Sequence, residues 1–185
     1  MKVELKMNDK SVQAEISEGQ LKELGLVEQL KKLGLLEDKP KTGYERVKKG
    51  EMYYVIDTEY NSMLKITEFN DKEDVQCHNT GNYYNDKIIA ENNARADRLL
   101  RQLRQWQAAN DKSISEKDWN DESKKKWFVA YSYGAEKLYA DYYYIMRLPN
   151  TIHFATKEKA EEAIEVFRDE LIWYFVEYQQ RLDEE

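Results

Sequence analysis

The chain has 185 residues, a formal net charge of -7, 41% hydrophobic residues and 35% charged residues. Because no apolar run approaches the roughly 18 residues that span a bilayer, and the N-terminus MKVELKMNDK has no signal-peptide segment, we expect a soluble cytoplasmic protein with no membrane partner. The acidic balance argues against broad attraction to nucleic acid, although local basic patches remain open.

The first 36 residues are predicted to form a small unit, a β-hairpin followed by a helix. The segments VELKM (3–7) and SVQAEI (11–16) alternate apolar and polar residues, and an Asn-Asp pair between them supplies a turn. Ser17 then provides an N-cap for a helix with leucines at helical spacing. The following stretch EDKPKTG (37–43) has the composition of a linker.

The next unit is predicted to be a β-meander followed by a long helix. EMYYVID (51–57) and MLKITEF (63–69) read as strands, and a polar stretch leads through GNYY to a helix over 86–109.

A second unit of the same order follows. WFVAYSY (127–133), KLYADYYYI (137–145) and TIHFA (151–155) are the predicted strands, and a helix is predicted over 156–182.

The two long helices begin alike, which predicts an α+β fold with an internal duplication. GNYYNDKIIAENNA (81–94) and TIHFATKEKAEEAI (151–164) each place an aromatic residue before a polar cap and alanines in the first turns. Convergent patterning is the alternative explanation. The polar segment 110–126 separates the two units. The predicted domains are 1–36, 44–110 and 124–185.

The first long helix carries arginine at every third position of one stretch. These residues are Arg95, Arg98, Arg101 and Arg104. An apolar sector of about 120 degrees occupies the other side, so the arginines sweep across the polar face and are candidates for binding a partner or nucleic acid. Glu91 and Asp97 each precede an arginine by four residues and are expected to pair with it. A merely solvated helix face is the alternative.

The second long helix is acidic at its start and apolar nearly all round at its end. The predicted acidic face consists of Glu158, Glu161, Glu162, Glu165, Asp169 and Glu170. In LIWYFVEY (171–178), Ile172, Trp173 and Val176 fall outside the main apolar stripe and must bury a second face. That face either packs against the first unit or forms a dimer or partner interface.

Six of the fourteen tyrosines lie in YSYGAEKLYADYYY (131–144). If Tyr142 and Tyr144 point into the core with Leu138, strand alternation sends Tyr139 and Tyr143 outward. Exposed tyrosines suit protein binding and stacking on single-stranded bases. A helix that covers this face is the alternative.

Catalytic and cofactor motifs are missing from the sequence. Cys77 and His78 form the one Cys/His neighbourhood, and His153 lies in a predicted strand, whereas a zinc site needs about four such ligands. No P-loop, dinucleotide-binding, metalloprotease or serine-hydrolase motif occurs. We therefore expect no enzyme, no cofactor and no metal.

The segment TGYERVKKGEMYYVI through GNYYNDKIIAENNARADRLLRQLRQW, with its echo IHFATKEKAEEAIEVFRDEL, resembles accessory proteins of Firmicute phages, prophages and mobile elements. The resemblance covers roughly residues 42–182. It implies a noncatalytic anti-defence protein in the cytoplasm of a bacterial host. Its partner would be a host nuclease or the nuclease's nucleic-acid complex, with an anti-CRISPR inhibitor of a Cas9-type nuclease as the leading expectation. The resemblance assigns no role to any single residue.

Two other functions stay open. One is a nucleic-acid-binding accessory protein that uses the arginine-rich helix on phosphates. The other is a structural or assembly protein that forms a homodimer through its C-terminal helix.

Overall fold

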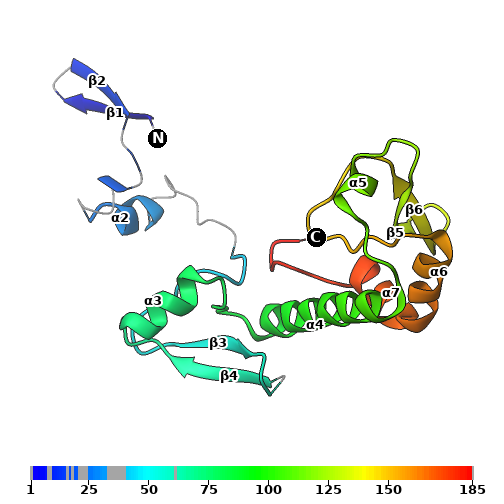
Figure 1. The fold of residues 1–185 in the computed structure, drawn as a ribbon. Helices are drawn as coiled ribbons and strands as arrows, with labels where there is room; N and C mark the ends of the chain where they lie inside the picture. Colours follow the sequence, from blue (N-terminus) through cyan, green and yellow to red (C-terminus); the bar gives the residue numbers. More distant parts are fainter. Residues whose placement is uncertain are drawn as a thin grey trace. The chain divides into compact units, whose positions relative to one another are not determined.

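A computed structural model describes residues 2–7, 10–15, 17, 19–20, 25–32, 41–60 and 62–184 (Figure 1). Helices and three two-stranded antiparallel sheets make up this part of the chain, which confirms the predicted α+β class. The chain divides into two compact units, Met1–Pro40 and Lys41–Glu185. The predicted boundary between 44–110 and 124–185 lies inside the second of these units.

The N-terminal unit contains the predicted hairpin. Strands β1 (Lys2–Met7) and β2 (Lys10–Glu15) pair antiparallel, and the Asn-Asp turn expected between them lies outside the described residues. Ser17 acts as a cap, because its hydroxyl accepts from the Gln20 backbone N–H while the Gln20 side chain accepts from the Ser17 N–H. Helix α2 then spans Val27–Lys32.

The second unit opens with an antiparallel hairpin of β3 (Met52–Asp57) and β4 (Ser62–Thr67). The polar stretch that follows contains helix α3 (Lys72–Asn79), for which the sequence analysis predicted no element. A capping box stabilises the start of α3. The Asp71 side chain accepts a hydrogen bond from the Asp74 backbone N–H, and the Asp74 side chain accepts one from the Asp71 backbone N–H.

Helix α4 spans Lys87–Asn110 and connects the two halves of this unit (Figure 1). Asp86 caps it by accepting from the Ile89 backbone N–H at 3.0 Å. Ile89, Ala96, Leu99 and Leu103 are buried on the predicted apolar side of α4, whereas Ile88, which was predicted on the same side, is 58% exposed. The start of α4 packs on β3, and Leu99 and Leu103 further along join a core with α6 and α7.

The polar segment after α4 holds a short helix, α5 (Glu116–Trp119), which the sequence analysis did not predict. Strands β5 (Lys126–Ser132) and β6 (Lys137–Tyr143) then form the third hairpin. The predicted strand 151–155 is wrong. Only Phe154 makes an isolated bridge, because the chain turns into a helix cap two residues later.

The predicted helix over 156–182 is two helices, α6 (Lys157–Val166) and α7 (Arg168–Val176). The break lies at Phe167, whose backbone leaves the helical region and whose ring packs against Trp106. Helix α7 ends six residues earlier than expected, after a run of aromatic and β-branched residues with low helix propensity. The tail then bonds back to the start of the unit through Leu182 and Thr42.

The two halves of the second unit share one local design. Tyr84 exchanges two backbone hydrogen bonds with Tyr54 on β3, at 2.7 and 3.0 Å. Phe154 exchanges the same two bonds with Trp127 on β5, at 3.0 and 2.7 Å. In both places a capping residue follows two positions later and begins the helix. This geometry supports the predicted duplication, with α3 present only in the first copy.

Candidate functional site

Arg95 is fixed to α7 and does not stand ready for a partner. Its Nε and Nη2 donate to the two carboxylate oxygens of Glu170 at 2.9 and 3.0 Å, and its guanidinium carbon lies 4.0 Å from the centroid of the Trp173 ring. The hydrogen bonds from Arg95 lower the pKa of Glu170. Arg95 and Glu170, which the sequence analysis placed on two separate binding faces, thus pair with each other and hold α4 and α7 together.

The other three arginines of α4 differ in accessibility. Arg101 and Arg104 are exposed, and Arg98 is half-buried. Arg98 and Arg101, together with Arg95, line a hollow of about 310 Å³ between α4 and the β3–β4 turn. The carboxylates of Asp57 and Glu91 line the same hollow, so its charge is mixed.

The intrahelical pairs expected for the arginines are not formed. Glu91 pairs with Lys87 at 3.2 Å instead of with Arg95, because Arg95 reaches Glu170 on α7. No ion pair joins Asp97 to its expected partner within the described residues.

The acidic face of α6 and Tyr139 of β6 line one groove. The groove has a volume of about 560 Å³ and lies between these two elements. Its acidic residues are Glu158, Glu161, Glu162 and Glu165, and its basic residues are Lys137, Lys157 and Arg168. Tyr139 is 38% exposed. The sequence predicted Tyr139 and the carboxylates for separate reasons, and the fold brings them together. Asp169 is exposed but does not line the groove.

Most carboxylates of this groove already have a basic neighbour on the same helix turn. The pairs are Lys157 with Glu161, Lys159 with Glu162, and Arg168 with Glu165. All these side chains are substantially exposed, so each pair is worth only about 0.2–0.5 kcal/mol. A cation of a partner can therefore replace the local one at little cost.

Tyr143, the other predicted outward tyrosine, is also exposed but has a partner. Its ring stacks on Phe128 with 5.1 Å between centroids. Tyr142 shares a strand face with Leu138 and packs against Trp127, as expected. Tyr144 does not join that face, because β6 ends at Tyr143 and leaves it exposed.

The predicted interface on α7 is only partly accessible. Ile172 and Val176 are exposed, at 36% and 50%. Trp173 is buried at 7%, under the Arg95 guanidinium and beside the Tyr178 ring. Trp173 is thus a packing residue, and its interpretation as an interface residue is wrong.

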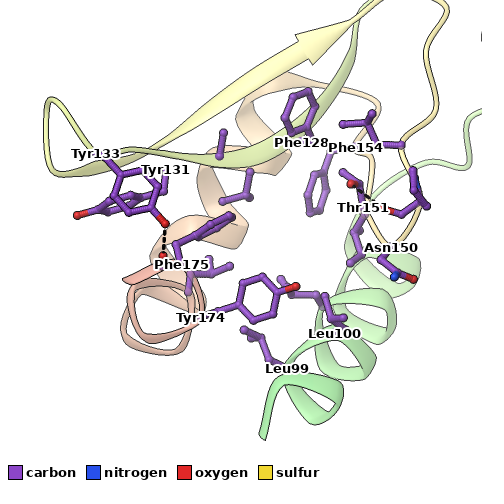
Figure 2. A pocket seen from close by; sticks show the side chains of 17 residues that line it. Leu99, Leu100, Phe128, Tyr131, Tyr133, Asn150, Thr151, Phe154, Tyr174 and Phe175 are labelled. Carbon is purple, nitrogen blue, oxygen red and sulfur yellow. Dashed lines mark hydrogen bonds between the residues drawn. The ribbon is translucent and has the colours of Figure 1, made fainter. Parts of the chain in front are cut away.

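An apolar cavity of about 410 Å³ lies between α4, β5, α7 and the segment 148–154 (Figure 2). None of its lining residues is charged, although 35% of the chain is. In Figure 2, Leu99 of α4 and Tyr174 of α7 form one wall, and the Tyr133 hydroxyl donates to the Phe175 carbonyl at the far side. The cavity has the size of a small-ligand pocket and accepts neutral, apolar groups.

A buried polar cluster in the first half of the unit is structural. Glu68 is fully buried and accepts hydrogen bonds from Arg46, from the Tyr83 hydroxyl and from the Asn70 backbone. The hydrogen bonds from Arg46 lower the pKa of Glu68, whereas burial and Glu68 raise the pKa of Tyr83 to about 12. Since the Glu68 carboxylate is satisfied, it anchors β4 and offers no free acid or base.

Asp74 is a second buried carboxylate with a structural role, at the start of α3. Burial raises its pKa, but hydrogen bonds from the Tyr53 hydroxyl and from the backbone of Phe69 and Asp71 outweigh this and lower the pKa to about 2. The carboxylate is therefore ionised and fully bonded at neutral pH, which suits a structural role.

Within the described ranges, no group of three or more His, Cys, Asp or Glu residues is placed to hold a metal ion. The helices described include none long and apolar enough to cross a membrane. No protein-family model, curated protein or solved structure matches the chain. The geometry of the chain's own residues is therefore the basis on which a function is proposed below.

The sequence analysis missed Arg147 and Trp119, which lie together with 5.3 Å between the guanidinium carbon and the ring centroid. It also missed the apolar cavity, because the residues that line it come from separate segments. A signal existed for Trp119: Ser115 and Asp118 have the spacing of a capping box and form one, which places Trp119 on a helix.

Proposed function

We propose that the chain is a noncatalytic anti-defence protein that binds and inhibits a host nuclease of the Cas9 type through the groove between α6 and β6. One observation carries this proposal: Tyr139 and four carboxylates of α6 line the same exposed groove. Tyrosine is enriched among the residues that dominate binding energy at interfaces, and carboxylates complement a basic surface.

A nuclease channel suits this groove because such channels are lined with lysine and arginine that hold phosphates. Carboxylates three and four residues apart lie about 5–6 Å from one another along one side of a helix. From Glu158 to Glu165 they form a row of carboxylates, three of them in exposed pairs with Lys157, Lys159 and Arg168, and the basic side chains of a phosphate-binding channel can replace these local partners. The family resemblance supplies the class of partner, and the groove supplies the surface.

The test uses neutralised carboxylates. Glu158, Glu161, Glu162 and Glu165 are changed together to Gln, which removes charge without adding repulsion inside the helix. Complex formation with a Cas9-type nuclease and inhibition of DNA cleavage are then measured. We expect both to be lost, and we expect wild-type binding to weaken as salt rises.

The matched control carries the same change of charge elsewhere. Its four residues are exposed and make no ion pair among the described residues, and they are Glu59, Glu73, Glu116 and Glu122. If control and groove variants lose binding equally, net charge alone explains the effect and the groove is not the site.

The nucleic-acid-binding alternative rests on Arg101 and Arg104, which are exposed on α4. It predicts binding of DNA or RNA that falls steeply with salt and a shallower salt slope for Arg104→Ala. Absence of binding at low salt removes this alternative.

A further inference from the structure

A polar pocket of about 320 Å³ lies beside the C-terminal part of α4, apart from the groove of α6. The polar and aromatic residues that line it come from α4, the segment before α5, α5 itself and the segment before α6. They are Arg104, Gln107, Ser113, Trp119, Arg147, Thr151 and His153. No carboxylate lines the pocket, so its formal charge is positive within an acidic chain.

Its two arginines are available to an anion. Arg104 and Arg147 are exposed, and neither makes an ion pair in the part of the chain that is described. Arg147 stacks its guanidinium over the Trp119 ring, and stacking of this kind orients the group while its N–H donors remain free. Guanidinium groups bind the oxygens of phosphate and carboxylate with strong, charge-assisted hydrogen bonds.

His153 also lines the pocket, and unlike the two arginines it is buried. His153 is 7% exposed and stands edge-on to the Trp119 ring, with 5.0 Å between centroids. Among the described residues, its Nε2 is the buried side-chain polar atom without a hydrogen-bond partner. Burial lowers the pKa of His153, and the charge of Arg147 lowers it further. With the imidazole neutral and its proton on Nδ1 toward the Thr151 backbone, Nε2 is an acceptor, so it suits a hydroxyl or N–H of the non-phosphate part of a bound molecule and not a phosphate oxygen.

We propose that this pocket binds the phosphate group of a small phosphate-bearing molecule, with Arg104 and Arg147 as its anion ligands and Trp119 beside the rest of that molecule. Phosphate is favoured over carboxylate because donors lie on several sides of the pocket, from Gln107 and Ser113 as well as the arginines, and phosphate offers more acceptor oxygens. The site is independent of the groove proposed to bind a nuclease.

Titration calorimetry on the full chain tests the proposal, with inorganic phosphate, AMP and adenosine as probes. We expect phosphate and AMP to bind and adenosine not to bind. Arg104→Gln and Arg147→Gln keep most of the side chain and should each weaken binding of AMP by about tenfold or more. Arg101→Gln is the matched control, because Arg101 is exposed on the same helix but lines a different hollow.

If AMP binds more tightly than inorganic phosphate, the result supports the proposal that Trp119 lies beside the adenosine part of AMP. Equal affinity for the two still supports a phosphate site. The proposal is overturned if neither phosphate nor AMP binds, if adenosine binds as well as AMP, or if Arg101→Gln weakens binding as much as the two pocket variants. Circular dichroism of each variant distinguishes loss of the site from loss of the fold.

Discussion

Tyr84 and Phe154 occupy the same position in two successive parts of one structural unit, 70 residues apart in the chain. Both rings are buried, and both backbones are bonded to the first strand of the preceding hairpin. The bridge fixes the direction of the chain just before a polar residue caps the next helix. Hairpin and helix are thereby joined into one packed element at each place.

The first prediction concerns the two caps. Asp86→Ala and Thr156→Ala each leave a backbone N–H at a helix start without its acceptor, so each should lower the free energy of unfolding by about 1 kcal/mol. Urea denaturation measures this. Thr58→Ala is the control, because Thr58 is exposed in the β3–β4 turn and caps no helix, and it should change stability by less than about 0.5 kcal/mol. No cost at either cap would contradict the shared design.

The second prediction concerns Arg95 and Glu170. A double-mutant cycle with Arg95→Gln and Glu170→Gln should give a coupling energy of about 0.2–1 kcal/mol, because both side chains are more than a third exposed and solvent screens the pair. The coupling should shrink as salt is added. Urea denaturation of the four proteins measures it, and zero coupling at low salt would show that the pair does not tie α4 to α7.

The third prediction concerns acid. The pKa values of Asp74 and Glu68 are lowered in the folded chain, to about 2 for Asp74, whereas unfolded carboxyls titrate near 4. The stability that these groups contribute is therefore present above about pH 4 and is lost as the pH falls toward 2. Thermal unfolding followed across this range should show a steep decline in Tm.

Asp74→Asn checks the origin of that decline. The variant should be less stable at pH 7 and should show a flatter dependence on pH, because one titrating group is gone. An unchanged slope would assign the acid sensitivity to other carboxyls.

The fourth prediction separates packing from association on α7. Trp173→Glu places a charge in a buried position and should abolish the cooperative unfolding transition. Val176→Glu changes a side chain that is 50% exposed and should leave the fold intact. Light scattering on the Val176 variant then tests the homodimer alternative: a dimer in the wild type that becomes a monomer in the variant would support it.

The sequence was sufficient to predict the helices and strands whose apolar residues recur at a regular spacing. The alternation in residues 51–57 and 127–133 predicted β3 and β5, and the apolar repeat from Ile89 to Leu103 predicted the buried side of α4. Helices α3 and α5 were missed because their residues are mostly polar and only their capping boxes mark them.

Tertiary contacts explain the remaining differences. A helical pattern runs through Phe167, but that ring packs against Trp106 and the helix breaks there. Arg95 has a carboxylate one turn away, yet it bonds to Glu170, which is remote in sequence. Periodicity within one segment contains no information about such partners. The pocket of Arg104, Arg147 and His153 was missed for the same reason.

We propose that the groove of α6 and β6 is the surface that binds a nuclease. The most direct test of this proposal is the affinity of the chain for a Cas9-type nuclease, compared between wild type, the variant with Gln at Glu158, Glu161, Glu162 and Glu165, and the variant with Gln at the four control positions. We expect binding for wild type and control and a loss of at least about a hundredfold for the groove variant, since several charge contacts are removed together. Unchanged affinity of the groove variant, or no binding by the wild type, would contradict the proposal.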